Sequence, residues 1–259
     1  MERTVLVTGG DRGLGFALCA ALLKGGWHVF AGQYMPEWHE LAGLMNEYPQ
    51  TLYILPLDVS SRESVQAVAE TVSEHTDHLD VLINNAGLGD LGPFATSDPI
   101  RNEQIMLVNM MALTSLTRHL LPQMIARKRG GILNVSSSAG FLPIPNFAIY
   151  AGTKAYVTSF SEALRAELRG TGVSVCALCP GPVHTEFQEV AKRSGGQRED
   201  GPEFVHVSVE QVVRDSLAGL EADRPLVIPG LPMKIGMFLV RITPMSILRW
   251  ASRFSPKRP

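Results

Sequence analysis

The sequence predicts an α/β fold: one domain built on a doubly wound, mostly parallel sheet of about seven strands, with helices on both faces. Short β-branched apolar runs alternate with longer helical patterns along the 259 residues. No linker-like break divides the chain, so residues 1–259 are expected to form one domain. Strand alternating with helix gives right-handed crossovers and a parallel sheet covered on both sides.

The first unit is predicted to be a strand, a glycine turn and a helix. The apolar run TVLVT precedes the segment GGDRGLG, and an apolar helical pattern then stops at Gly25 and Gly26. Such glycines let the main chain approach a pyrophosphate, and the free N–H groups at the helix start hold its charge. The spacing differs from GxGxxG, and a tight strand-to-helix connection is the alternative. We predict nucleotide binding here.

The same alternation continues to the end of the sheet. Further strands are expected over residues 27–31, 52–57, 81–84, 131–136, 173–178 and 226–228. Helices are expected over residues 38–48, 61–74, 102–127, 150–169 and 208–221. Ligands of such sheets bind beyond the carboxyl ends of the strands.

Composition narrows the class of protein. A net charge of −2 gives no support for nucleic-acid binding, and 45% apolar residues can build a large core. Three cysteines are too few for a disulfide framework, and a charged start followed by an apolar leader is missing, so we expect a cytoplasmic protein. Cys176 and Cys179 lie in an apolar run without a second ligand cluster, so buried thiols are expected and no metal site.

Polar or glycine-rich residues follow five of the predicted strands. They gather at one edge of the sheet: the glycine turn, Asp58, the segment NNAG at 84–87, the segment NVSSS at 134–138 and the segment PGPVHT at 180–185. Turn formation and helix capping explain each of them singly. Their coincidence at one edge indicates a binding site.

Tyr150 and Lys154 form the candidate catalytic pair. Residues four apart on a helix share a face, so the phenol and the ammonium are expected to project into one space. An ammonium at ~4 Å in an effective dielectric near 20 is worth about 4 kcal/mol, which could lower the pKa of a phenol by two to three units. A half-buried ring beside a solvated charge is the alternative.

The chain resembles the short-chain dehydrogenase/reductase family in its compact single-domain branch. The resemblance covers nearly the whole chain, with T8GGDRGLG15, D58V, N84NAG87, Asn109, the serine run, Y150xxxK154 and P180GPVHT185 in order. It implies a Rossmann-type fold that binds NAD or NADP and transfers hydride between a nicotinamide and a carbonyl or alcohol.

The resemblance also implies catalytic roles. Tyr150 would be the general acid in reduction and the base in oxidation, and Lys154 would lower its pKa and hold the nicotinamide ribose. Ser137, thirteen residues before Tyr150, would polarise the substrate carbonyl, with Ser138 as a substrate contact or helix cap. Asn109 would bind the water that links Lys154 to solvent, although a satisfied buried amide is the alternative.

A wider set of residues would contact the cofactor by the same resemblance. Asp58 would meet the adenine, residues 85–87 would line the riboses, and Val183 with Thr185 would hold the carboxamide. The predicted cofactor-binding set comprises Thr8, Gly9, Gly10, Asp11, Arg12, Gly13, Leu14, Gly15, Gln33, Tyr34, Asp58, Val59, Asn85, Ala86, Gly87, Tyr150, Lys154, Pro180, Gly181, Val183 and Thr185.

The residues after the second strand favour NADP over NAD. An NAD enzyme places an acid there, whereas this chain has Gln33 and Tyr34. Arg12 could pair with a 2′-phosphate, as in several NADP-dependent relatives, or be a solvated turn residue. NADP is the predicted cofactor, with NAD as the alternative.

Apolar residues beside the expected nicotinamide site indicate an apolar carbonyl or secondary alcohol as substrate. The predicted pocket comprises Leu88, Ser138, Phe141, Leu142, Phe147 and Phe187. Packing under loops is an equal alternative for these side chains. The polar segment 186–206 is predicted to be a substrate lid, with an exposed loop as the alternative.

The C-terminal segment 230–259 is basic, and its residues Ile247, Trp250, Ala251 and Phe254 share one helical face. Three interpretations stand in order: packing on the parent domain, closing a subunit interface, or resting on an anionic membrane. The family implies a homo-oligomer, a dimer or tetramer.

Three functions follow from these observations. The first is an NADPH-dependent carbonyl reductase. The second is an NAD-dependent dehydrogenase of hydroxy-lipid or steroid-like alcohols. The third, from another class, is a nucleotide-binding regulatory protein without turnover.

Overall fold

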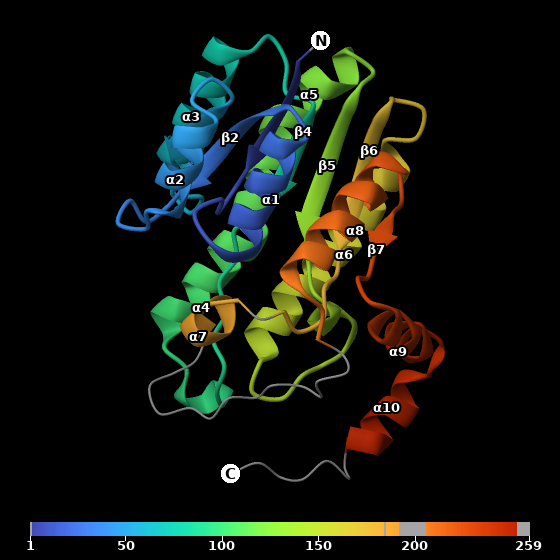
Figure 1. The fold of residues 1–259 in the computed structure, drawn as a ribbon. Helices are drawn as coiled ribbons and strands as arrows, with labels where there is room; N and C mark the ends of the chain where they lie inside the picture. Colours follow the sequence, from blue (N-terminus) through green and yellow to red (C-terminus); the bar gives the residue numbers. More distant parts are fainter. Residues whose placement is uncertain (1, 184, 192–205, 253–259) are drawn as a thin grey trace.

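The computed structural model describes residues 2–183, 185–191 and 206–252. In this part of the chain one seven-stranded parallel sheet runs in the order β3-β2-β1-β4-β5-β6-β7 (Figure 1). Its strands are β1 (Arg3–Val7), β2 (Trp27–Gln33), β3 (Leu52–Pro56), β4 (Val81–Asn84), β5 (Gly130–Val135), β6 (Val173–Leu178) and β7 (Leu226–Val227). The doubly wound α/β fold is confirmed. The strand order reverses between β1 and β4, where such sheets bind ligands.

Helices cover both faces of the sheet. On one face lie α1 (Gly13–Lys24), α2 (Glu40–Glu47) and α8 (Val209–Glu221), and on the other α3 (Arg62–His75), α5 (Leu113–Ala126) and α6 (Ala148–Glu167). Successive side chains of a strand point to opposite faces, so Val5 and Val7 pack under α1 while Leu6 packs under α3. Both faces are therefore apolar, which explains the continuous apolar strands in the sequence.

The predicted helix 102–127 is longer and less regular than expected. It starts as α4 (Pro99–Met106), passes through a π-helical segment η2 (Leu107–Ala112) and continues as α5. It starts early because the Asp98 side chain accepts a hydrogen bond from Ile100 N and because proline suits a first helical turn. The π segment contains Asn109, and such segments are frequent at functional sites.

The remaining elements lie near the candidate site and at the C-terminus. They are η1 (Phe94–Thr96), η3 (Ser138–Phe141), α7 (Phe187–Ala191), α9 (Leu231–Ile242) and α10 (Met245–Ser252). Of the predicted lid 186–206, α7 lies within the structure, whereas residues 192–205 fall outside the described part. Residues 253–259, including Phe254, fall outside it too. In the described ranges, every helix is too short or too polar to cross a membrane.

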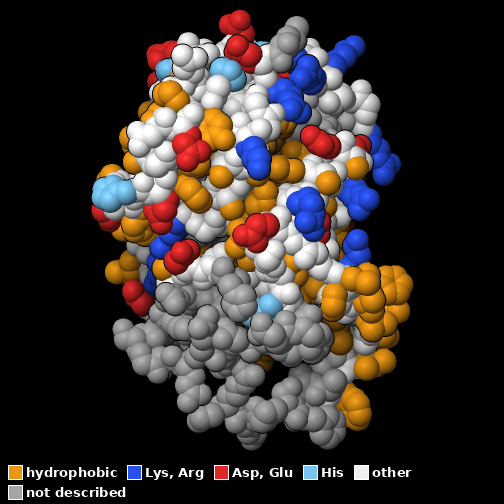
Figure 2. Space-filling model, in the orientation of Figure 1, with side chains coloured by type: hydrophobic (Ala, Val, Ile, Leu, Met, Phe, Trp, Pro, Cys, Tyr) orange, Lys and Arg blue, Asp and Glu red, His pale blue; other side chains and the backbone are white. Residues whose placement is uncertain are grey.

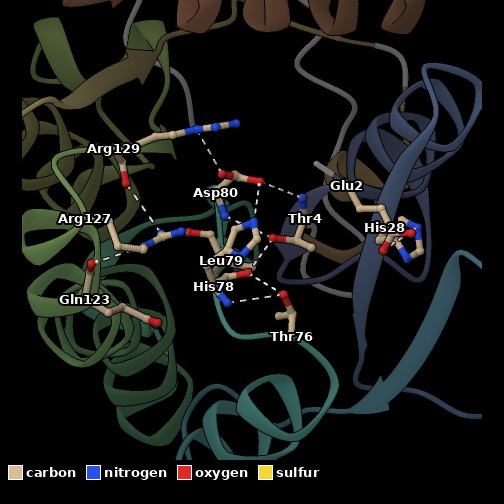
Figure 3. A network of polar contacts seen from close by, with 10 residues as sticks. All are labelled: Glu2, Thr4, His28, Thr76, His78, Leu79, Asp80, Gln123, Arg127 and Arg129. Carbon is tan, nitrogen blue, oxygen red and sulfur yellow. Dashed lines mark hydrogen bonds and ion pairs between the residues drawn. The ribbon is translucent and has the colours of Figure 1, made fainter.

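A polar network ties the start of β1 to the start of β4, at the edge opposite the glycine turn. Asp80, with a side chain 6% exposed, accepts a hydrogen bond from Thr4 N at 3.0 Å. Its carboxylate also lies 3.3 Å from Arg129 Nε and 3.6 Å from His78 Nε2 (Figure 3). Arg127 donates to Leu79 O at 2.7 Å beside it. None of these hydrogen bonds and ion pairs between described residues involves a residue of the candidate site.

Replacing Asp80 with Ala should therefore lower stability and spare activity. The change leaves a buried main-chain N–H without its acceptor, so we expect the free energy of unfolding to fall by about 2 to 3 kcal/mol. Urea denaturation measures this difference. Asp77→Ala is the matched control, because Asp77 is exposed and should change stability by less than about 0.5 kcal/mol. If Asp80→Ala and Asp77→Ala had the same free energy of unfolding, Asp80 would not stabilise the fold in the way described.

Candidate active site

The glycine turn brings the main chain of β1 against the start of α1. A Cβ atom on Gly15 would lie 1.9 Å from Gly9 O, so no other residue fits there. Gly9 and Gly13 have positive φ angles of 60° and 52°, which glycine adopts without strain. The first turn of α1 has neither a side-chain cap nor an acidic residue. Its N–H groups therefore fit a phosphate.

The loop after β4 is fastened to this turn. Thr8 Oγ1 accepts hydrogen bonds from the N–H groups of Asn85 and Ala86, each at 3.0 Å. Asn85 Nδ2 donates to Thr8 O at 3.0 Å and to Gly9 O at 2.9 Å. Asn85 was predicted to line a ribose, but its amide donor is used to shape the turn. Ala86 and Gly87 follow it at the carboxyl edge.

A carboxylate does lie at the end of β2, although it comes from the glycine turn. Asp11 is 3% exposed, and its Oδ2 accepts from Tyr34 N at 2.9 Å and from Met35 N at 3.3 Å. We predicted no acid at this place because Gln33 and Tyr34 carry none. The side chain of Tyr34 is exposed. Asp11 therefore fixes the loop after β2 to the turn.

Arg12 and Trp38 form a stacked pair beside that loop. The guanidinium carbon of Arg12 lies 3.8 Å from the centroid of the Trp38 ring. Gln33 Nε2 donates to Trp38 O at 3.0 Å, so Gln33 helps to fix the main chain at Trp38. Sequence reasoning identified Arg12 and Gln33 but missed Trp38. An aromatic residue a few positions after the second strand could have suggested it.

Tyr150 lies in the first turn of α6 and is buried. Burial raises the pKa of its phenol to about 12, while a hydrogen bond with Ser137 acts in the opposite direction. Ser136 is 2% exposed and bonds Lys154 O at 2.8 Å and Thr158 Oγ1 at 2.7 Å. Because the hydroxyl of Ser136 bonds these two groups, Ser137 is the serine that forms a hydrogen bond with the phenol. This placement agrees with the choice made from the spacing to Tyr150.

Lys154 shares a face of α6 with Tyr150, but its ammonium has a different main partner. Nζ donates to Val135 O at 2.8 Å and lies 5.6 Å from the centroid of the Tyr150 ring. Burial lowers the pKa of Lys154 to about 8. The expected lowering of the Tyr150 pKa is not what the structure gives, because desolvation of the buried phenol outweighs its hydrogen bond with Ser137.

Asn109 joins the loop after β4 to the helix of Tyr150. Its Oδ1 accepts from Leu88 N at 2.8 Å, and its Nδ2 donates to Leu88 O at 2.9 Å and to Thr153 Oγ1 at 3.0 Å. Thr153 Oγ1 in turn donates to Tyr150 O at 2.8 Å. The amide is satisfied by protein groups, which was the alternative expectation, and its water-binding role stays a prediction.

Sequence reasoning missed a buried polar chain below this site. Asn84 Nδ2 donates to Asn134 Oδ1 at 2.8 Å and to Thr117 Oγ1 at 3.2 Å. Asn134 Nδ2 donates to Ser161 Oγ at 2.9 Å. These hydrogen-bonded side chains link the ends of β4 and β5 to α5 and α6. They thereby fix α6, which carries Tyr150 and Lys154, relative to the sheet.

Two phenylalanines cover the phenol. The ring of Phe147 stacks on Tyr150 with centroids 4.2 Å apart, and the ring of Phe187 in α7 lies 5.4 Å away. A Cβ atom on Gly89 would lie 3.1 Å from Phe187 and 3.0 Å from Ala191, so α7 packs closely on the loop after β4. Leu91 N donates to Ala191 O at 2.7 Å. Helix α7, at the start of the segment predicted to be a lid, therefore lies beside Tyr150, and the role of the segment as a lid stays a prediction.

The other predicted pocket residues make contacts of their own outside the phenol. Phe141 is the exception to the expected wall, because it packs with Ile228, Met233 and Met237 under α9. Ser138 N donates to Pro180 O at 2.9 Å, which joins η3 to the loop after β6. Leu88 and Leu142 are half-buried beside these segments.

The loops after β3 and β6 complete the edge. Asp58 Oδ1 accepts from Ser60 N at 2.9 Å, and Val59 packs on the core. Val183 pairs with Val207 in an isolated parallel bridge. A Cβ atom on Gly13 would lie 3.6 Å from Thr185. The structure thus brings the glycine turn and the loop after β6 together, as the sequence predicted.

A parallel sheet with a glycine turn and a buried Tyr-Lys helix at its carboxyl edge defines a nucleotide-dependent oxidoreductase. The family model described as short chain dehydrogenase matches residues 3–194. The chain belongs to the short-chain dehydrogenase family.

Known relatives agree with this class. The chain is 33% identical to serine 3-dehydrogenase of Rhizobium radiobacter over 219 residues, 84% of this chain and 86% of the relative. It is 34% identical to a probable NADP-dependent dehydrogenase of Haemophilus influenzae, over 84% and 85% of the two chains. A solved closed form of serine dehydrogenase complexed with NADP+ superposes with a TM-score of 0.78 at 30% identity, over 87% of this chain and 93% of that one.

Proposed function

We propose that this oxidoreductase reduces an apolar carbonyl with NADPH. The observation that carries the proposal is the apolar cover of Tyr150: its ring contacts the rings of both Phe147 and Phe187. A carbonyl that reaches the phenol must contact these rings, which favours apolar substituents. An NAD-dependent dehydrogenase of hydroxy-lipid or steroid-like alcohols is the alternative within the same site.

In this proposal Tyr150 gives a proton to the carbonyl oxygen. A phenol whose pKa is raised to about 12 stays protonated throughout the neutral range, so it holds the proton that reduction requires. Ser137, which bonds the phenol, would donate a hydrogen bond to the same oxygen. The cationic form of Lys154 would stabilise the phenolate that proton transfer leaves.

The residues at the carboxyl edge fit a dinucleotide. The open N–H groups of α1 would hold the pyrophosphate, and Arg12 would pair with a 2′-phosphate. Lys154 would hold the nicotinamide ribose. A bound nicotinamide supplies the hydride. Two relatives carry NADP in their names, which supports the preference over NAD.

A second candidate substrate comes from the relatives. The name serine 3-dehydrogenase indicates a small, polar, zwitterionic amino acid as substrate, and the second candidate is oxidation of a compound of that kind. The aromatic rings over Tyr150 favour the apolar substrate instead. The family's tendency to form homo-oligomers stays a prediction for this chain.

A comparison of substrates tests the proposal. The purified enzyme is supplied with NADPH and a series of aryl and alkyl ketones, and with NADP+ and L-serine, while absorbance of the reduced nicotinamide is followed. We expect kcat/KM for the best ketone to exceed that for serine by at least about 100-fold. Faster serine oxidation would replace the proposal with the second candidate.

The pH dependence of ketone reduction should follow Lys154. Its pKa is about 8, so its charge is present below that pH and lost above it. The active form carries the charge, and kcat should be flat between about pH 6 and 7 and fall as the pH rises through 8. Lys154→Met should reduce kcat and remove this fall. If kcat of Lys154→Met still fell with the same midpoint pH, the decrease would belong to another titrating group.

A further inference from the structure

The charges of this chain are divided unevenly along its length. Residues 224–259 hold seven of the 23 Lys and Arg residues and none of the 25 Asp and Glu residues, so this segment has a net charge of +7. The other sixteen cations face all 25 acids, so residues 1–223 have a net charge of −9. A weakly acidic protein therefore ends in a strongly basic segment: residues 1–223 are negatively charged and residues 224–259 positively charged.

Helix α9 in this segment has two apolar faces. Met233 is buried, and Met237 follows one turn later on the side that packs on Ile228 and the end of β6. This confirms packing on the parent domain for that side. The opposite side carries a second apolar stripe at spacings of four, three, one and three residues: Leu231, Ile235, Phe238, Leu239 and Ile242, all exposed.

The exposed surface continues into α10. Met245, Ile247 and Trp250 are exposed there, with Trp250 at 59%. Figure 1 places α9 and α10 beyond β7, at the end of the sheet. Figure 2 shows hydrophobic side chains gathered on this side of the molecule. We call the exposed apolar residues of α9 and α10 the C-terminal surface.

We propose that the C-terminal surface rests on an anionic lipid membrane. Leu, Ile, Phe and Trp side chains on one face, flanked by cations, are the features of helices that lie in the membrane interface. Lys234 is exposed and lies beside the apolar stripe on the helix surface. Arg241 lies further from the stripe, and its guanidinium is 3.7 Å from the carboxylate of Glu162. Anionic headgroups attract such cations, while the acidic body is repelled and stays above the surface.

A second copy of the chain fits this surface less well. A two-fold symmetric contact would place the stripe of one copy on the stripe of the other and bring the Lys234 side chains together. An anionic membrane removes this repulsion and covers the same apolar side chains. The surface lies outside the residues proposed for catalysis, so the inference does not depend on the substrate or the cofactor.

Vesicle sedimentation with the full chain tests the proposal. We expect binding to vesicles of one third phosphatidylserine and two thirds phosphatidylcholine, with at least about tenfold weaker binding to pure phosphatidylcholine and in about 0.5 M salt. Phe238→Ser and Lys234→Glu should each weaken binding by at least about fivefold. Phe94→Ser is the matched control, because Phe94 is 63% exposed and Phe238 is 62% exposed.

Circular dichroism checks that each variant is folded. Phe238, Lys234 and Phe94 are all exposed, so we expect the three variants to fold. Equal binding by Phe94→Ser and Phe238→Ser would overturn the proposal. So would a failure of the wild-type chain to bind anionic vesicles, or a dimer that Phe238→Ser converts to monomers without any vesicle binding. The last result would make the surface an interface between copies.

Discussion

Tyr150→Phe should lower kcat for ketone reduction by about 1000-fold, because general acid catalysis by a positioned side chain contributes between 10²- and 10⁴-fold. The substitution removes only the phenolic oxygen and keeps the ring that packs on Phe147. Binding of NADPH, followed by nicotinamide fluorescence, should therefore change by less than about threefold. Both quantities are measured on the same preparation.

Tyr156→Phe is the control for this experiment. Tyr156 lies on the same helix α6, partly exposed, and its hydroxyl bonds Thr114 Oγ1 at 2.8 Å. Loss of that hydroxyl should leave kcat within about twofold. Full turnover by Tyr150→Phe would refute the proposed acid. An equal loss in both variants would show that the helix, and not the phenol, is responsible.

Arg12→Leu should weaken NADPH binding by roughly 10- to 100-fold, because a hydrogen bond to a charged group contributes about 1.5 to 3 kcal/mol. NADH lacks the 2′-phosphate, so its affinity should change by less than about threefold. Trp38→Leu should give an intermediate loss for NADPH alone, because it removes the ring on which the guanidinium stacks. Fluorescence titration with both nucleotides measures these affinities.

Arg118→Leu serves as the control, because Arg118 is an exposed arginine of α5. Its loss should leave both affinities unchanged. If Arg12→Leu weakened NADPH and NADH equally, Arg12 would act on a part common to both nucleotides, and the argument for NADP would fail. The carboxylate of Asp11 at the end of β2 would then be the better candidate for selecting the ribose.

The order of strands and helices could be predicted because the apolar pattern is strong on both faces of the sheet. Polar or glycine-rich residues follow five of the strands at the same edge, so the glycine turn and the serine run were predicted to lie together, and the family resemblance singled out Ser137 and Tyr150. Helix starts were less certain, because caps decide them. The helix 102–127 shows this: Asp98 and Pro99 start it earlier, and the π segment around Asn109 has no signal in the apolar spacing.

The contacts within the site could not be predicted from the sequence. Asp11 reaches the end of β2 across twenty-three positions in the sequence, and Asn84 meets Asn134 across fifty. Such pairs depend on how loops fold back, which spacing along one element does not describe. The pKa of Tyr150 was expected to fall, but burial under aromatic rings raises it. Desolvation depends on the side chains that surround the phenol in space, and one of them, Phe187 of α7, is distant in the sequence.

Titration of the purified protein with NADPH and with NADH, followed by nicotinamide fluorescence, tests the central claim most directly. We predict saturable binding of both, with a Kd for NADPH at least about tenfold lower, because Arg12 meets the 2′-phosphate. Tighter binding of NADH would contradict the cofactor preference and direct attention to alcohol oxidation. Binding of neither nucleotide would contradict the proposed site as a whole.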